Sequence, residues 1–154
     1  MATPIRDQLL TAFRTALLGI TTGGGYQQTV DAVFRDGEWT GNADEKFAVI
    51  VTDNGDDPVR LHLSLVREGW MQLEVKPVFH NADPSDRRAA LAKLNADIEK
   101  MVHVDQTFGG LAFETHVRGV RNNLNEASEV AVGVVAVDIM YRVKRYDPYT
   151  VQDI

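Results

Sequence analysis

The sequence contains no cysteine, and this absence removes two classes of structure. Disulfide bonds are excluded, and so are metal sites that depend on thiolate ligands; a chain of this kind fits a reducing compartment. No window approaches the roughly 18 uninterrupted apolar residues of a membrane span, so none is expected. The first residues, MATPIRDQLL, lack the basic segment, apolar run and cleavage site of a signal peptide.

An excess of positive charge is also missing. The chain has 16 Lys and Arg residues against 22 Asp and Glu residues, which gives a formal net charge of −6. This balance argues against a sequence-independent grip on nucleic acid, which requires clustered cations against phosphates. The length of 154 residues, with 44% hydrophobic and 25% charged residues, predicts one ordinary globular domain.

Recognisable catalytic motifs are absent as well. The four histidines are scattered without the spacing of an HExxH metal site, and no GxSxG nucleophile elbow occurs. His62 and His116 stand between polar neighbours in strand-like segments, so we expect them to face solvent. The sequence therefore nominates no catalytic, cofactor-binding or metal-binding residue, and we expect a protein that is not an enzyme.

The clearest structural signal is a helix that starts at Asp83, has Lys100 and His103 in its last turn, and is over by Gly109 and Gly110. Asp83 is a good N-cap, and Pro84 suits the first helical position because its fixed φ fits and its missing N–H costs nothing. Apolar residues then recur at three- and four-residue steps and share one face of the helix: Leu91, Leu94, Ile98, Met101 and Val102.

A second amphipathic helix is predicted near the N-terminus. Thr3 is its expected cap, Pro4 its first residue, and Gly19 its end. Its apolar stripe comprises Ile5, Leu9, Ala12, Phe13, Ala16 and Leu17. The glycine-rich segment 21–25 follows, and we interpret it as a flexible linker rather than a phosphate-binding loop, because Tyr26 and Gln27 replace the required Lys–Ser/Thr pair.

The remaining segments favour strands. TDNGDDP at residues 52–58 is interpreted as a hairpin turn rather than a calcium loop, since Asn-Gly is a strong turn signal and the EF-hand ligand spacing is missing. A second turn is predicted at Glu68–Gly69, and Pro77 should weaken pairing or mark a sheet edge. The last strand is apolar on both faces in its first half and is expected to be central. The predicted strands cover residues 28–35, 46–52, 59–65, 71–75, 111–124 and 130–146.

Together these elements predict an α+β fold in a single domain, with a mixed, antiparallel-rich β-sheet flanked by two main α-helices. Residues 147–154 are expected to form a mobile C-terminal tail. Three aromatic residues stand in polar segments outside the predicted core: Trp39, Tyr146 and Tyr149. Trp39, in the polar loop 36–45, either folds back onto the core or serves as an interface anchor, since aromatic residues are enriched at contact hot spots.

The order of elements and three phrases resemble the tail terminator proteins of long-tailed bacteriophages, also called tail completion or minor tail proteins. The phrases are IRDQLLTAFRTALLGI running into GYQQTV, the helix end ADIEKMVHVDQTFGGLA, and the closing strand VAVGVVAVDIMYRVKRYDPY. The most suggestive piece combines Asp105, Thr107, Gly109, Gly110, Leu111 and Ala112. The resemblance covers most of the chain as a pattern and carries no residue-level site with it.

The resemblance implies a structural virion protein of the tail neck, assembled in the host cytoplasm. Such subunits form a ring, usually a hexamer, that caps the head-proximal end of the tail tube and stops its polymerisation. Their partners are further copies of the chain, the tail tube protein and the head-side connector or stopper protein. DNA passes through the bore without specific binding, and neither a cofactor nor a membrane is involved. Within this hypothesis we nominate Trp39, Tyr146 and Tyr149 as assembly-interface residues.

Two alternatives remain open. The first places the ring one position along the neck, as a head–tail connector or another junction component, because that role differs in partner and not in physics. A small-molecule binding module or uncharacterised enzyme is supported only by the glycines at 23–25 and the acidic segment 53–57. A ligand-shaped pocket with convergent polar groups would favour this second alternative, the binding module or enzyme.

Overall fold

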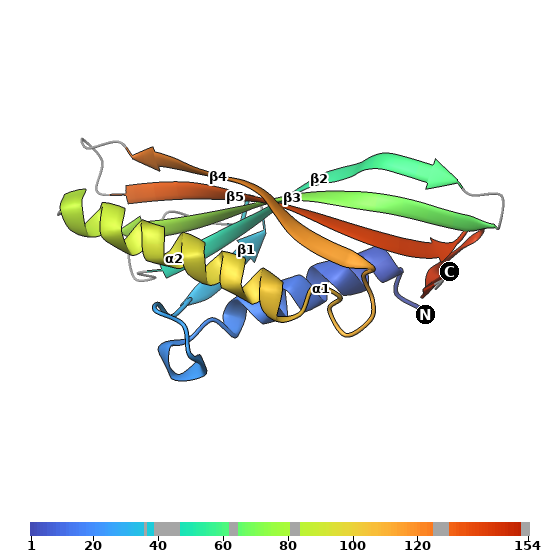
Figure 1. Cartoon of the computed structure of the whole chain (residues 1–154), viewed down its shortest axis with the longest axis horizontal. Coiled ribbons are helices and arrows are strands. Elements are labelled where there is room, and N and C mark those ends of the chain that lie inside the picture. The colour runs from blue at the N-terminus through green and yellow to red at the C-terminus, as the bar shows by residue number, and fades with distance from the viewer. Residues whose placement is uncertain (36, 39–46, 62–64, 81–83, 125–129, 152–154) are drawn as a thin grey trace.

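A computed structural model describes residues 1–35, 37–38, 47–61, 65–80, 84–124 and 130–151. The chain forms one six-stranded mixed sheet with both α-helices on one of its faces (Figure 1). The strands are β1 (Ala32–Arg35), β2 (Phe47–Leu61), β3 (Val66–His80), β4 (Glu114–Leu124), β5 (Val130–Lys144) and β6 (Asp147–Val151). The predicted α+β, antiparallel-rich fold with two main helices is confirmed.

The sheet has the order β1-β2-β3-β5-β4, and β6 pairs with the end of β5. Only β1 and β2 run parallel among the paired strands; the other pairs are antiparallel. β5 lies between β3 and β4, so the prediction of a central strand over this apolar segment is confirmed. β3 and β4 are joined by the long helix, which crosses the face of the sheet (Figure 1).

Both helices bury the apolar faces that the sequence predicts. They are α1 (Ile5–Leu18) and α2 (Pro84–Val104), and Gly19 ends α1. Leu9, Phe13 and Leu17 of α1 are fully buried in one core with the helix-facing side of the sheet. On α2 all five predicted positions are buried: Leu91, Leu94, Ile98, Met101 and Val102. None of the described helices is long and apolar enough to cross a membrane.

The helix starts differ from the prediction at one point. Pro4, not Thr3, occupies the N-cap of α1, and no side chain caps that end. The expected cap of α2, Asp83, lies outside the described residues. The glycine-rich segment also holds local structure: Thr22–Gly24 form a short 3-10 helix, η1, capped by the Thr21 hydroxyl. Lys100 of α2 donates to the carbonyl of Gly25 at 2.6 Å, so this segment is tied to the helix layer.

Both turns predicted between residues 52 and 69 are wrong. β2 runs straight through TDNGDDP, and two register shifts, between Asp53 and Asp56 and between Asp56 and Val59, each absorb one extra residue as a bulge. Gly55 has a φ of +86°, which glycine adopts without strain. β3 likewise continues through Glu68 and Gly69. The result is a pair of 15-residue strands instead of three short ones.

Pro77 lies in β3, inside the sheet and not at its edge. It faces Val49 of β2, whereas the β3–β5 register skips residues 76 and 77 between Val75 and Val78. A proline has no N–H to donate, so pairing is lost on one side and kept on the other. Of the two alternatives predicted for Pro77, weakened pairing is therefore the one that the structure shows, and a sheet edge is not.

The C-terminal segment was expected to be a mobile tail over residues 147–154. Residues Asp147–Val151 instead form β6, which pairs with β5 at Val143 and Lys144. Val151 packs against the main core. DPYTV is too short to predict a strand by itself, and it forms one because it pairs with the adjacent β5.

Candidate assembly surface

The most distinctive feature outside the core is an arm of strands. β2, β3 and β5 continue together past the N-terminal end of α1, and β6 joins them near the end where both termini lie (Figure 1). We define the arm as residues 53–61, 65–73 and 137–151. Its end, residues 59–61, 65 and 144–149, is called the arm tip. Arg145 N donates to the carbonyl of Leu65 at 2.6 Å and so joins the two chain segments of the tip.

Large apolar side chains are concentrated at the arm tip. Of ten exposed large hydrophobic residues in the described part of the chain, five lie there, with exposures from 46% to 81%: Val59, Leu61, Leu65, Tyr146 and Tyr149. Scattered apolar residues are normal on a protein surface, but a group of this kind marks a contact site. The arm tip is therefore the candidate assembly surface.

Two of the three nominated interface residues, Tyr146 and Tyr149, belong to the arm tip. Trp39 lies outside the described residues. In the predicted strand 59–65, Val59, Leu61, Leu63 and Leu65 alternate with polar residues, which is the period of a half-buried strand. Val59, Leu61 and Leu65 are instead exposed, Leu65 lies outside the strands, and Leu63 is not among the described residues. α1 does not reach the end of β2 that carries Val59 and Leu61, so the described helices leave this face uncovered (Figure 1).

A network of charged and hydroxyl groups fixes the root of the arm to α1. The Arg6 guanidinium binds the Asp53 carboxylate in a bidentate fashion, at 2.6 and 2.5 Å, and donates from Nε to Asp56 at 2.9 Å. The Tyr141 hydroxyl donates to the other Asp56 oxygen at 2.5 Å and accepts from Arg67 at 3.1 Å. These five residues, called the Arg6 network, come from α1, β2, β3 and β5.

The network perturbs two of its members in opposite ways. The hydrogen bonds from Arg6 hold the pKa of Asp53 below its usual value, against the effect of partial burial. Burial, followed by the hydrogen bond to Asp56, raises the pKa of Tyr141. The ring of Tyr141 lies over Gly69, where an added Cβ would come within 3.0 Å of it. The glycine therefore makes room for the ring that links β5 to β2.

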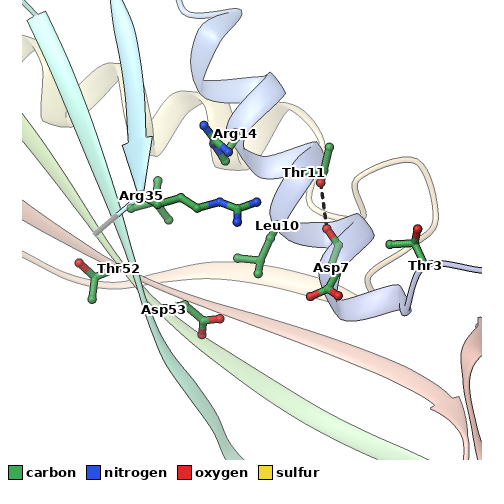
Figure 2. Close-up of a pocket in the computed structure, with 9 residues that line it drawn as sticks. Thr3, Asp7, Leu10, Thr11, Arg14, Arg35, Thr52 and Asp53 are labelled. Atoms are coloured by element: carbon green, nitrogen blue, oxygen red, sulfur yellow. Dashed lines mark hydrogen bonds between the residues drawn. The ribbon is translucent and has the colours of Figure 1, made fainter. Parts of the chain in front are cut away.

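A cavity of about 560 Å³ lies between α1 and the β1–β2 side of the sheet (Figure 2). The guanidinium of Arg35 extends from β1 toward α1, and Arg14 donates to the carbonyl of Val33 at 3.3 Å. Asp7 and Asp53 place carboxylates at the same cavity. The lining thus mixes both signs of charge with hydroxyls and two apolar residues: Thr3, Asp7, Leu10, Thr11, Arg14, Arg35, Val51, Thr52 and Asp53.

A second hollow is an apolar groove of about 410 Å³ between the C-terminal halves of α1 and α2. Val104 stands at this groove with 70% of its surface exposed. The only charged side chain among the lining residues is Asp105. We call it the α1–α2 groove, and it is lined by Ala12, Thr15, Ala16, Gly19, Tyr26, Met101, Val104, Asp105 and Phe108.

The two segments that suggested a ligand site are engaged within the chain. In η1 the N–H groups of Gly24 and Gly25 donate to Thr21 and Thr22, so they do not form an open phosphate cradle. In the acidic segment, Asp53 and Asp56 bind Arg6 and Tyr141 as described above. Across the described residues, no cluster of three or more His, Asp or Glu side chains is arranged to hold a metal ion. His116 is exposed, as predicted, and lies 5.2 Å from the Trp70 ring.

Comparison of the sequence with protein-family models gives no match, and comparison with curated proteins gives no significant similarity.

Proposed function

We propose that this chain is the subunit of a phage tail terminator ring, which caps the head-proximal end of the tail tube and ends its polymerisation. The observation that carries the proposal is the arm tip. There, large apolar side chains are exposed at the end of β2 and in the segments beside it, where α1 and α2 do not extend over the sheet. A soluble monomer gains nothing from such a surface, whereas an assembling subunit uses it as a contact.

A closed ring requires that every subunit present its contact surface at the same angle. The Arg6 network supports this requirement, since it joins α1 to three strands at the root of the arm. Two of its groups, Arg6 and Asp53, are bound in a bidentate pair, the geometry that adds directional specificity to an ion pair. The arm is therefore suited to act as a fixed projection.

The proposed ring also has to let DNA pass. A net charge of −6 is compatible with a bore that repels phosphates and does not trap the strand. One face of the ring would then meet the tail tube and the other the head-side connector, within the tail neck of the virion. We propose a structural role and not an enzymatic one, because Asp53 and Asp56 of the acidic segment are engaged by Arg6 and Tyr141.

A head–tail connector, or another neck component, is the second candidate. The same exposed arm serves a ring at either position, so the two roles differ only in the protein that the ring meets. Capping of purified tail tubes distinguishes them, since a connector ring would leave tube growth unchanged.

Size-exclusion chromatography with light scattering, followed by negative-stain imaging, tests ring formation. We expect a species of about six times the 17.1 kDa chain mass, with a central hole. Replacing Tyr146 and Tyr149 by Ala should shift this species toward the monomer, because both side chains are exposed at the arm tip. Phe113→Ala, which removes a 50% exposed aromatic ring elsewhere, is the matched control. Rings that persist unchanged in the double variant would contradict the role of the arm tip.

A further inference from the structure

Two separate surfaces of the chain are both apolar and carry charges of opposite sign. The arm tip is apolar and cationic, and the α1–α2 groove is apolar with one carboxylate. We propose that the arm tip of one subunit docks into the α1–α2 groove of a second copy of this chain, and that this contact, repeated, closes the ring. The inference rests on the proposed function for the ring, but it names the two contacting surfaces and is tested separately.

The arm tip carries cations beside its apolar side chains. Its charged residues are Arg60, Lys144, Arg145 and Asp147, a surplus of two positive charges in a chain whose net charge is −6. Arg60 and Lys144 are exposed, and the Arg145 guanidinium lies 5.3 Å from the centre of the Tyr146 ring. Tyrosine and arginine are both enriched at protein contacts, and here the two side chains lie side by side.

The α1–α2 groove offers the complementary chemistry. Small side chains, Ala12 and Ala16, form its α1 wall. On the opposite side Val104 supplies exposed apolar surface, and the largely buried Met101 and Phe108 also line the groove. Asp105 is exposed at this groove, and its carboxylate accepts from Thr107 and Gly109 of its own turn. No cation pairs with Asp105 within the described part of the chain, so its charge is available to a partner.

Within one subunit the two surfaces are held apart. The N-terminal end of α1 lies beside the root of the arm, through Arg6, and the groove is on the C-terminal half of the same helix. From Ile5 to Ala16 the helix axis advances by roughly 16 Å, directed away from the arm tip. The contact can therefore form only between copies. Because it joins two different patches, it is heterologous and generates a ring when its rotation closes.

Cross-linking of single-cysteine variants tests this contact directly, because the natural chain has no cysteine to interfere. Leu61→Cys places a thiol at the arm tip and Val104→Cys places one at the groove; the natural residues are 57% and 70% exposed. With a short bismaleimide, an equimolar mixture of the two variants should give covalent dimers. Neither variant alone should do so, since a heterologous contact does not bring identical positions together.

The matched control pairs Leu61→Cys with Val120→Cys, which is 40% exposed on β4. That pair should stay at the background level of cross-linking. Dimers of either single variant alone would indicate a two-fold contact and overturn the docking proposal. The reaction is run under conditions where light scattering shows assembly or, if the chain is monomeric in solution, with tail tubes present. Absence of the Leu61–Val104 cross-link in both settings overturns the proposal.

A charge exchange provides the second test. Lys144→Glu or Asp105→Lys alone should weaken assembly by about fivefold per contact, the upper range for an exposed ion pair. The double variant should recover most of the loss, because the pair is restored with its signs exchanged. Lys93→Glu, on the exposed side of α2, should have no such effect. Independent, additive losses in the double variant would contradict a contact between these two groups.

The two proposals fail in distinguishable ways. Rings that assemble and cap tubes without the Leu61–Val104 cross-link would leave the terminator function standing and remove the docking assignment. Cross-linked rings that do not cap tubes would leave the contact standing and remove the terminator function.

Discussion

At Gly133 of β5, the side chains of α2 pack closely against the backbone of the sheet. A Cβ at this position would lie 3.0 Å from Asn95 Oδ1, 3.2 Å from Pro77 Cγ and 3.3 Å from Leu91 Cδ1. We predict that Gly133→Val forces α2 away from β5 and lowers the free energy of unfolding by about 1–3 kcal/mol, the usual cost of overpacking. Chemical denaturation measures this change.

Gly119 provides the matched control in the neighbouring strand. An added Cβ there meets no atom within 4 Å, so Gly119→Val should leave the unfolding free energy nearly unchanged. Equal effects of the two substitutions would show that strand propensity, and not the contact with α2, determines the result at Gly133.

Tyr141 is the buried member of the Arg6 network. We predict that Tyr141→Phe lowers the unfolding free energy by about 1–2 kcal/mol, because Asp56 loses a donor while its side chain stays largely buried. The raised pKa of Tyr141 means that its contribution to stability is present below about pH 10 and is lost as pH rises through the pKa of the folded protein.

Ultraviolet absorbance of tyrosinate checks this pH dependence. In the natural protein one tyrosine should ionise above the ordinary tyrosine pKa, and that late step should disappear in Tyr141→Phe. Tyr149→Phe is the control, since its ring is exposed, and it should leave both stability and the late step intact. Retention of the late step in Tyr141→Phe would contradict the assignment.

At the scale of the element, Arg6 joins α1 to the arm. Arg6→Ala should lower the unfolding free energy at neutral pH by about 2 kcal/mol, because two charged hydrogen-bond partners lose their donor. The lowered pKa of Asp53 means that this contribution is present above about pH 4 and is lost as pH falls through the pKa of the folded state. The difference between natural and variant protein should therefore shrink in acid.

Denaturation at a series of pH values measures that difference. Lys93→Ala, which removes an exposed cation of α2, should show no comparable pH dependence. A gap between natural protein and Arg6→Ala that stays constant from neutral pH to well below pH 4 would exclude the ion pair as its cause.

Helix and central-strand predictions succeed because their information is local. The apolar faces of α1 and α2 repeat every three or four residues, and each face meets one side of the sheet. The failures fall in β2 and β3, where Asn54–Gly55 indicates a turn. Gly55 does adopt the left-handed φ of such a turn, but pairing with β3 converts it into a bulge. Local turn chemistry cannot show which long-range pairing competes with it.

The Arg6 network could not be predicted from the sequence either, because its residues come together only through long-range strand pairing. Arg6 and Asp53 are separated by 47 positions, and Asp56 and Tyr141 by 85. Tyr141 lies in the predicted last strand, 130–146, but its hydroxyl partner depends on two bulges that realign β2. The aromatic residues in polar segments, Tyr146 and Tyr149, were the sequence signal for the candidate assembly surface.

At the scale of the whole molecule, the arm tip is the region where the burial predicted from the sequence differs from the burial in the structure. The apolar alternation in residues 59–65 predicts a half-buried strand, whereas Val59, Leu61 and Leu65 are exposed in the structure. Our proposal of an assembling subunit uses these exposed side chains as a contact surface. Length and composition predicted a single domain with a negative net charge. They contained no information on which parts of the sheet the helices would cover.

Growth of tail tubes in the presence of the chain tests the central proposal most directly. Purified tail tube protein is polymerised with and without this chain, and tube lengths and ends are measured by electron microscopy. We predict that added chain shortens the tubes, that a ring appears at one end only, and that the Tyr146→Ala, Tyr149→Ala variant loses this effect. Tubes that grow to the same length with bare ends, at chain concentrations where rings are present, would contradict the terminator function.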